Sequence, residues 1–432
     1  MSNAPHVVVI GAGAVGAAVA MRALEAGLRV TLVEPDAPGG RQAASYGNAG
    51  WLSSHSILPP AEPGVWRKVP KWIADPLGPL AVRWRYLPSA LPWLWRYLRA
   101  AWTWPRVERT AHALRTLLRD APALHQQQAA WAGVSELIEQ RGLLHVFLNE
   151  AQFRADKRAW DIRRAEGIEW EELDAQALRA REPALDARYT FGVWVPETGS
   201  CRDPGRYVAA LVSRALALGA ELHTTRATGF HIEDGRLLAV RTEHGEIPCD
   251  KAVIATGVHA RALAGQAGDR VPLAAERGYH VVIRDAPVGV HTSAQFADAK
   301  MVVNWTDQGL RAAGQVEIAA PDAAPNWERA RILRRQLVGI FPELSRAEAV
   351  AGASAQAGLG DEADFWLGCR PSMPDGLPCI GPASASADIV HAYGHGHVGL
   401  VSSARTGRLV VQVLMGTPTD IDLRPFSPRR FA

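Results

Sequence analysis

A glycine-rich turn near the start of the chain limits the possible folds more than any other feature of the sequence. Residues 7–10 are a short β-branched run, which predicts a buried parallel strand. Residues 14–26 are rich in alanine and predict a helix that stops at Gly27, and residues 30–33 predict a second strand. The spacing G-x-G-x-x-G between the first strand and the helix falls on Gly11, Gly13 and Gly16. Together these elements predict a βαβ unit that binds a dinucleotide at the helix N-terminus.

An acidic residue follows the second predicted strand. Glu34 stands where a carboxylate accepts both ribose hydroxyls of a dinucleotide, and its charge disfavours the 2′-phosphate of NADP. The alternative is a glycine- and alanine-rich helix start that binds no ligand, but here the acid, the turn and both strands occur together. The residues expected at the cofactor are Gly11, Ala12, Gly13, Ala14, Val15, Gly16, Glu34 and Pro35.

Composition excludes several other classes of protein. A chain of 432 residues with 48% hydrophobic residues can bury a large core, which predicts two domains. The net charge of +3 gives no indication of a nucleic-acid partner. No lysine or arginine precedes the first apolar run, so we expect neither a signal peptide nor a membrane span. The 4 cysteines are scattered without a C-x-x-C pair, which predicts neither disulfides nor a metal site and favours a reducing, cytoplasmic setting.

A second α/β block begins near the middle of the chain. Asp203 is an N-cap for a helix over residues 206–218, and a strand at residues 221–225 follows. A hairpin turning at residues 233–235 and an apolar strand at residues 251–255 come next. Strands that alternate with helices in this way predict a parallel sheet.

The remaining sequence predicts a second layer and a final helix. Residues 276–318 alternate in polarity with period two, as antiparallel strands do, and residues 327–340 show an amphipathic helical pattern. A strand at residues 389–393 precedes a long helix over residues 400–414. We therefore predict an α/β chain with a discontinuous, Rossmann-like dinucleotide domain and an inserted α+β substrate domain that contains an antiparallel sheet. The predicted boundaries are 1–60, 196–275 and 369–432 for the first domain, and 61–195 and 276–368 for the second.

Tryptophans and cations are interleaved along residues 66–104. Prolines are expected to break this segment into short pieces, and residues 107–132 predict a helix with a break at Pro122. Indole rings with cations suit a membrane surface, so the segment is a candidate for peripheral contact with the inner membrane. The alternative is packing inside the substrate domain or at a subunit interface. The residues are Trp66, Trp72, Trp84, Trp93, Trp95, Trp102 and Trp104 with Arg67, Lys68, Lys71, Arg83, Arg85, Arg96 and Arg99.

Three further motifs carry a family resemblance. They are the Ala-Ser-Tyr-Gly-Asn-Ala-Gly run at 44–50, the Gly-Cys-Arg-Pro…Asp-Gly-Leu-Pro-Cys-Ile-Gly block at 368–381, and Gly-His-Gly-His-Val-Gly at 394–399. With the N-terminal unit, they make nearly the whole chain similar to the FAD-dependent amine oxidoreductases of the D-amino-acid oxidase superfamily. That superfamily includes glycine oxidase and sarcosine oxidase, and the chain most resembles the small-subunit type of bacterial D-amino-acid dehydrogenase.

The resemblance implies FAD as the cofactor and assigns further contacts to it. Cys369 lies within about one position of the cysteine that tethers flavin in monomeric sarcosine oxidase, but buried cysteines are usually inert, so we expect non-covalent FAD. The amides at the start of the last helix would stabilise charge on the flavin ring. The contacts implied by resemblance are Ser45, Asn48, Ala49, Gly50, Ala227, Ala255, Thr256, Gly257, Gly396, His397, Val398 and Gly399.

Four residues are the candidates for substrate chemistry. Arg370 occupies the position of the family's Leu-Arg-Pro arginine, and its planar guanidinium suits a substrate carboxylate; the alternative is a structural arginine. Tyr279 and His280 are expected on a strand that faces the substrate, although both could be ordinary strand residues. His397 stands where glycine oxidase has a second arginine, and the family's other substrate tyrosine falls at Val302.

These residues predict an enzyme that oxidises an amino acid by hydride transfer from Cα to flavin N5. D-Amino acids are the expected substrates, and a quinone or other electron carrier is the expected acceptor. The alternatives within the class are D-proline or hydroxy-D-proline dehydrogenation, by the chain alone or as a subunit of a complex, and glycine or sarcosine oxidation. Rivals outside it are an NAD(P)H-dependent monooxygenase and a flavin-binding scaffold subunit.

Overall fold

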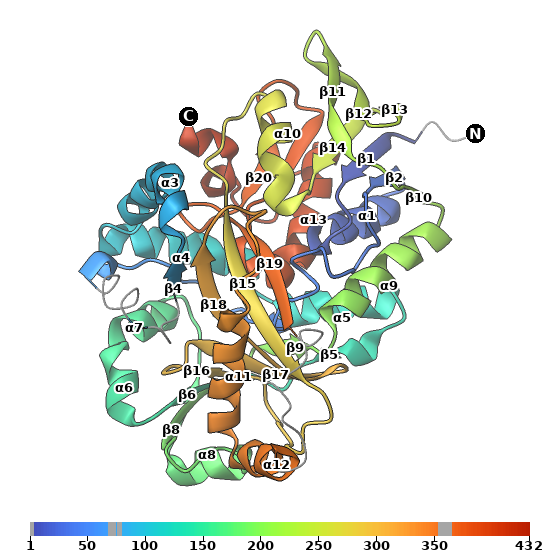
Figure 1. The fold of residues 1–432 in the computed structure, drawn as a ribbon. Helices are drawn as coiled ribbons and strands as arrows, with labels where there is room; N and C mark the ends of the chain where they lie inside the picture. The colour runs from blue at the N-terminus through green and yellow to red at the C-terminus, as the bar shows by residue number, and fades with distance from the viewer. Residues whose placement is uncertain (1–3, 68–74, 76–79, 353–364) are drawn as a thin grey trace.

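A six-stranded sheet carries the N-terminal turn in the computed structural model, which describes residues 4–67, 75, 80–352 and 365–432. Its first five strands pair in parallel and the last is antiparallel, so the predicted parallel sheet is confirmed. Three distant stretches of chain build this sheet, seen in the upper half of Figure 1. The order is β10 (Glu221–His223), β2 (Arg29–Val33), β1 (His6–Ile10), β14 (Lys251–Ile254), β21 (Ile389–Tyr393) and β20 (Cys379–Pro382).

Both faces of this sheet are covered. Successive residues of β1 point to opposite faces, so Val7 and Val9 join one hydrophobic cluster while Val8 and Ile10 join another. The helix after the glycine turn packs between two later helices on the first face. The other face meets the predicted hairpin, which extends into a third strand. The covering elements are α1 (Ala14–Glu25), α9 (Pro204–Ala217) and α13 (Gly399–Met415), and on the far face β11 (Ala227–Glu233), β12 (Arg236–Thr242), β13 (Gly245–Pro248) and α10 (Ala260–Gln266).

A nine-stranded sheet forms the second layer, lower in Figure 1. Its neighbours pair antiparallel except at β16–β6 and β18–β4, which confirms the antiparallel strands predicted over residues 276–318. The order is β19 (Phe365–Ser372), β15 (Ala274–Ile283), β18 (Gly309–Ile318), β17 (Met301–Thr306), β16 (Ala294–Phe296), β6 (Leu143–Phe147), β8 (Phe191–Val195) and β7 (Glu171–Leu173), with β4 (Leu80–Val82) beside β18.

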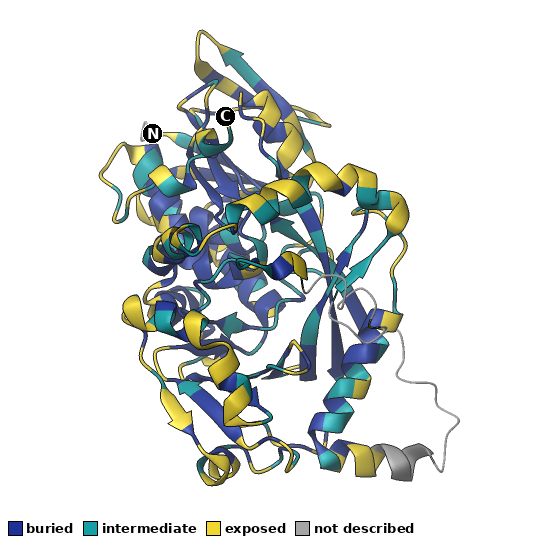
Figure 2. Ribbon diagram, turned by 90° about the vertical axis from the view of Figure 1, so that its left-hand side faces the viewer, coloured by how far each residue is buried: buried dark blue, intermediate teal, exposed yellow. Residues whose placement is uncertain are grey.

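Short elements complete this layer. Figure 2 shows that the central strands of both large sheets are mostly buried, while the outer faces of the surrounding helices are exposed. One hydrophobic cluster lies between the nine-stranded sheet and the predicted helix at residues 327–340. The remaining elements are α6 (Glu150–Ala155), α7 (Lys157–Ala165), α8 (Ala175–Arg181), α11 (Glu328–Ile340), α12 (Pro342–Gly352), and a small sheet of β3 (Trp51–Leu52), β9 (Gly199–Cys201) and β5 (Ile138–Glu139).

The tryptophan-rich segment differs from its prediction. Helix α3 (Leu87–Ala100) runs unbroken through Pro92, because a proline costs an interior helix one hydrogen bond without necessarily ending it. The break predicted at Pro122 instead lies between α4 (Trp104–Leu118) and α5 (Ala121–Trp131), where Asp120 has φ 60°. Pro122 falls in the first turn of α5, where its missing N–H is no loss. Lys68, Lys71 and Trp72 lie outside the described residues.

The domain boundaries predicted from the sequence stay a prediction. None of the helices in the described part of the chain is long and apolar enough to cross a bilayer.

Candidate active site

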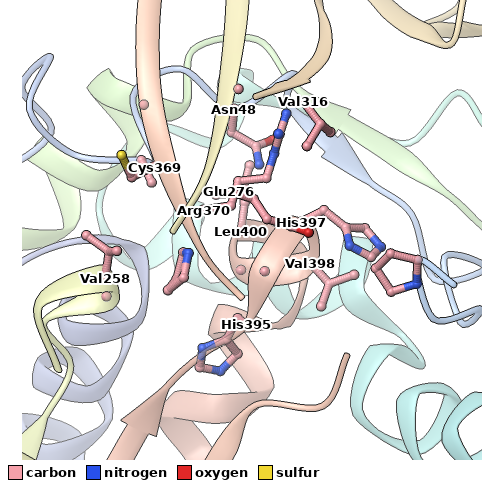
Figure 3. A pocket seen from close by; sticks show the side chains of 18 of the residues that line it. Asn48, Val258, Glu276, Val316, Cys369, Arg370, His395, His397, Val398 and Leu400 are labelled. Atoms are coloured by element: carbon pink, nitrogen blue, oxygen red, sulfur yellow. The ribbon is translucent and has the colours of Figure 1, made fainter. Parts of the chain in front are cut away.

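A cavity of about 1960 Å³ lies between the two large sheets. Its lining includes Gly11 and Gly13 of the glycine turn on one side and Val302 and Ala313 of the nine-stranded sheet on the other. Figure 3 shows part of it from close by, with Arg370 and several neighbours pointing into the open space. The fold therefore brings the predicted cofactor turn and the predicted substrate sheet to one site.

The glycine turn has the geometry that its spacing predicts. Gly11 has φ +101°, and a Cβ there would lie 2.6 Å from the Ala255 carbonyl oxygen. Gly16 packs so closely on the turn that a Cβ would overlap the Gly11 carbonyl oxygen. Gly13, by contrast, has open space beside it, and Ala14 and Val15 line the cavity with it. Backbone rather than side chains thus forms this end of the cavity.

The predicted ribose acid lies beside that turn. Glu34 and Pro35 line the cavity, and the Ala12 amide donates a 2.8 Å hydrogen bond to Glu34 Oε2. Ala12 therefore acts from behind the wall by orienting the carboxylate. Asp36, which the sequence reasoning did not single out, also lines this part of the cavity.

The other predicted cofactor residues come from separate loops. Ser45, Asn48 and Ala49 line the cavity, and so do Ala227, Ala255, Thr256 and Gly257. Gly50 is set back against Cys201, whose amide donates a 2.7 Å hydrogen bond to the Gly50 carbonyl oxygen. Gly396, His397 and Val398, in the turn before α13, and Gly399, its first residue, line the cavity as well.

The walls fit a flavin dinucleotide. Ser45 and Thr256 line this region, and within the described structure Ser45 Oγ and Thr256 Oγ1 are buried without a hydrogen-bond partner. Two orphan hydroxyls beside an open glycine and a helix N-terminus suit a polar, phosphate-bearing ligand, because buried polar groups otherwise find partners. Cys369 also lines the cavity, and burial raises the pKa of its thiol, which disfavours a reactive thiolate.

Arg370 projects from β19 into the cavity. It is half-buried, and its guanidinium lies over Gly278 of β15, where a Cβ would overlap it. Its guanidinium donates one long hydrogen bond, 3.5 Å from Nη1 to the Gln315 carbonyl oxygen. Burial lowers the pKa of Arg370, and the nearby Glu276 carboxylate acts in the opposite direction. A guanidinium held this way is available to a ligand carboxylate.

Two histidines lie near the start of α13 (Figure 3). His397 is exposed to the cavity but surrounded by protein on its other sides, and burial, assisted by the Arg370 cation, lowers its pKa to about 4. Burial lowers the pKa of His395 to about 3. Both imidazoles are therefore neutral at pH 7, so His397 offers hydrogen bonding rather than a second positive charge.

Tyr279 and His280 are placed differently from the expectation that both side chains face the substrate. Tyr279 reaches the cavity wall, but its hydroxyl donates a 2.6 Å hydrogen bond to Glu317 Oε2 and accepts one of 3.0 Å from the Asn326 amide. Burial raises its pKa to about 12. His280 stacks on Trp366 at 5.0 Å and has Nδ1 3.2 Å from the Gly47 carbonyl oxygen, outside the cavity lining. The Tyr279 hydroxyl is occupied by Glu317 and Asn326, and the His280 ring packs on Trp366, so the structure brings neither polar group to the site.

Glu276 and Ser372 are site residues that the sequence reasoning missed. Glu276 lines the cavity two residues before Gly278, in direct register with Arg370 on the next strand. Ser372 Oγ donates a 2.6 Å hydrogen bond to its Oε2. Strand residues two apart point to the same face, so Glu276 could have been placed on the cavity face with Gly278. That inference required the pairing with Arg370 to be known.

The cavity floor continues past Arg370 across several strands. Ala313, Val302, Gln295 and His145 are successive partners in register on β18, β17, β16 and β6, and all four line the cavity. Val302 therefore leaves room where a larger side chain would close the floor. Trp160, Asp156 and Arg163 lie at the far end, where Arg163 is 4.6 Å from the Trp160 ring centroid.

The tryptophan-rich segment forms one rim of the cavity. Trp66, Trp84 and Trp95 line it in part while remaining 51%, 63% and 62% exposed. Trp102 and Leu91 of the same segment are also more than half exposed. This is an apolar surface beside an opening, with Arg67 5.1 Å from the Trp66 ring.

A parallel sheet that presents a glycine turn to an antiparallel sheet, with a cavity between them, is the arrangement of an FAD-dependent oxidoreductase. The chain belongs to the family described as DAO, FAD dependent oxidoreductase, which matches residues 6–413. It is an FAD-dependent enzyme that acts on amino acids, as the sequence predicted.

Relatives agree with this family. The chain is 57% identical to a D-amino-acid oxidase of Bradyrhizobium diazoefficiens over 431 residues, covering 100% of both chains. It is 31% identical to a D-amino acid dehydrogenase of Paramagnetospirillum magneticum, covering 98% of each. The fold is shared with glycine oxidase from Geobacillus kaustophilus, with TM-score 0.73, 21% identity and 98% coverage of each chain. It is also shared with L-proline dehydrogenase from P. horikoshii, with TM-score 0.71, 20% identity and coverage of 100% and 98%.

Proposed function

We propose that this enzyme oxidises D-amino acids to imino acids, which water converts to 2-oxo acids, and that a quinone or another electron carrier takes the electrons. The observation that carries the proposal is Arg370, a half-buried cation aimed into a cavity that reaches the glycine turn. Two relatives are named for action on D-amino acids, which supports this stereochemistry.

The residues of the chain account for binding and orientation. Arg370 takes the α-carboxylate, because its fork of N–H donors matches two carboxylate oxygens. Gly278 leaves space for the guanidinium, and the neutral His397 offers a hydrogen bond beside it. Bound FAD supplies a hydride acceptor at its ring N5. The substrate loses the Cα hydrogen with its electron pair, and the amine loses a proton, which leaves the imino acid.

The start of α13 supports the reduced state of the cofactor. Residues 396–399 line the cavity at the positive end of the helix dipole, which would stabilise negative charge on the ring. The cofactor contacts predicted from the sequence, with Glu34 at the ribose, complete the proposed FAD site.

The apolar rim supports an acceptor other than oxygen. Trp84, Leu91 and Trp95 expose large apolar surfaces beside the cavity mouth, which suits a hydrophobic carrier or peripheral contact with a membrane. Relatives carry both oxidase and dehydrogenase names, so the acceptor requires its own assay.

The test is the visible absorption of the purified holoenzyme under anaerobic conditions, before and after adding single amino acids. The panel holds D-alanine, D-phenylalanine, D-arginine, D-proline, glycine, sarcosine and their L-counterparts where these exist. Bleaching of the flavin by D-amino acids is expected. Bleaching by NADH alone would contradict the proposal, and preference for D-proline or for glycine would reassign the substrate.

A second assay decides the acceptor. The reduced enzyme is mixed with air-saturated buffer or with a soluble ubiquinone analogue, and flavin re-oxidation is followed. Faster re-oxidation by the quinone analogue, with little hydrogen peroxide formed in air, is expected. Rapid re-oxidation by oxygen with stoichiometric peroxide would make the enzyme an oxidase.

A further inference from the structure

Glu276 places a negative charge next to the proposed carboxylate site. It is half-buried on β15, lines the cavity, and lies directly opposite Arg370 of β19. Side chains so placed have Cβ atoms about 4.5–5.5 Å apart, and opposite charges there ordinarily pair. Among the described residues, however, neither group has an ion-pair partner within 4.0 Å.

The two head groups are held apart because they turn in opposite directions along β15. The Arg370 guanidinium lies over Gly278, with Nη1 directed to the Gln315 carbonyl oxygen. The Glu276 carboxylate turns the other way, where Ser372 Oγ donates to Oε2 at 2.6 Å. Ser372 pairs with Ala274, which lies on the other side of Glu276 from Gly278 along β15.

This arrangement leaves one oxygen of the Glu276 carboxylate without a hydrogen-bond partner among the described residues. Ser372 holds Oε2, and no hydrogen bond of the described residues occupies Oε1. Ser372 is also bridged to His395, so Glu276 is anchored to the segment that leads into the 396–399 turn. An anchored anion and a separate anchored cation then face the same space.

We propose that Glu276 binds the substrate's α-amino group while Arg370 binds its α-carboxylate, so that the two residues together recognise a zwitterion. A free α-amino acid carries an ammonium and a carboxylate on one carbon. This matches the separate, opposite charges of Glu276 and Arg370 on the same wall of the cavity. A simple carboxylic acid satisfies only Arg370 and leaves Glu276 as an uncompensated anion near its chain. The site thereby selects amino acids over carboxylic and hydroxy acids. This inference rests on the proposed function.

The test compares two unreactive ligands that differ in the amino group. 2-Aminoisobutyrate has both charges but no Cα hydrogen, and propionate has only the carboxylate. Their dissociation constants are measured from the perturbation of the flavin spectrum in the wild-type holoenzyme and in Glu276→Gln, Arg370→Lys and Asp322→Asn. Asp322 is an exposed acid at the cavity rim and serves as the charge-matched control.

Glu276→Gln should raise the dissociation constant of 2-aminoisobutyrate about tenfold or more. The dissociation constant of propionate should fall, or change by no more than about twofold. Arg370→Lys should weaken the binding of both ligands, and Asp322→Asn should weaken the binding of neither. Equal effects of Glu276→Gln on the binding of the two ligands, or no effect on either, would overturn the inference. The proposed function would still stand if D-amino acids bleach the flavin of the wild-type enzyme. A wild-type flavin that no amino acid reduces would overturn both.

Discussion

The two walls of the cavity hold their ligands by different means. On the six-stranded sheet, the wall is a backbone surface in which glycines and helix N-termini face the cavity, with Glu34 as its main charged group. On the nine-stranded sheet, the wall consists of side chains such as Arg370 and Glu276 that stand on the faces of strands. A backbone wall suits a cofactor that the whole family shares, whereas a side-chain wall can change its substrate by exchanging a few residues.

The walls also differ in what supports them. Behind the first wall, alanines and valines pack in apolar clusters. Behind the second, Glu317 is 1% exposed and bound to Arg83 at 2.8 Å, Arg277 at 3.3 Å and the Tyr279 hydroxyl at 2.6 Å. The second wall therefore depends on a buried ionic cluster that ties β15 to β18.

Glu317→Gln should produce the largest effect, because it leaves the buried Arg277 without a counter-charge. We expect the free energy of unfolding to fall by about 3–5 kcal/mol, measured by urea denaturation at saturating FAD. The exposed Glu150, paired with Arg154, is the control, and Glu150→Gln should change stability by about 0.5 kcal/mol or less. Similar losses in the two variants would show that the cluster does not support the wall.

Gly13→Ala tests the backbone wall. A Cβ at Gly13 meets only Ser45 Oγ at 3.9 Å in the protein, so the fold should tolerate it while the approach of a pyrophosphate should not. We expect unchanged circular dichroism and an FAD dissociation constant raised about 100-fold, or ~2.7 kcal/mol. Gly265→Ala, in α10 with no atom near the added Cβ, is the control. Undiminished FAD binding in Gly13→Ala would remove the turn from the cofactor site.

Val302→Phe sharpens the comparison by changing only the side-chain wall. The larger ring should close the floor between Ala313 and Gln295. We expect KM for D-phenylalanine and D-arginine to rise about tenfold, with D-alanine changed less than about threefold, in steady-state assays. Equal changes for all three substrates would mean that side chains do not lie along this floor.

His125 gives a smaller, pH-dependent effect behind the first wall. It is fully buried, with Nδ1 2.9 Å from the Tyr207 hydroxyl and Nε2 3.2 Å from the Val401 carbonyl oxygen, and burial lowers its pKa to about 4. The unfolded chain takes up this proton near pH 6.5 and the folded chain only near pH 4, so stability falls with acidification between them.

The expected slope for this histidine is about 1.4 kcal/mol per pH unit between roughly pH 6 and pH 4.5. Denaturation curves at several pH values, with FAD held constant, measure it. His125→Gln should reduce the slope of the free energy of unfolding against pH by an amount that corresponds to at most one proton. An identical slope in both proteins would show that His125 does not titrate on unfolding.

The backbone wall could be predicted from the sequence because its signals are local. The strand, glycine spacing, helix and following acid lie within 34 residues, and each has a direct steric or electrostatic reason. The βαβ unit, the C-terminal strand and the last helix were predicted within one or two residues of their observed bounds. Even so, Ala12, Gly16 and Gly50 prove to support the wall from behind rather than line it.

The side-chain wall could be predicted only in part because it depends on pairing between distant strands. Arg370 came from a family motif, but the register that sets Glu276 opposite it joins residues 94 positions apart. Tyr279 was chosen for its chemistry, although its hydroxyl is taken up by Glu317. The continuity of α3 was missed for another reason, since Pro92 removes one hydrogen bond from the helix without ending it.

The most direct test of this account is anaerobic flavin reduction by D-alanine in wild type and Arg370→Lys, measured across a range of substrate concentrations. If the two walls act separately, the variant keeps its FAD and its oxidised spectrum but needs about 100-fold more D-alanine for half-maximal reduction rate. The same half-saturating concentration in both proteins would contradict the account, and so would loss of FAD from the variant.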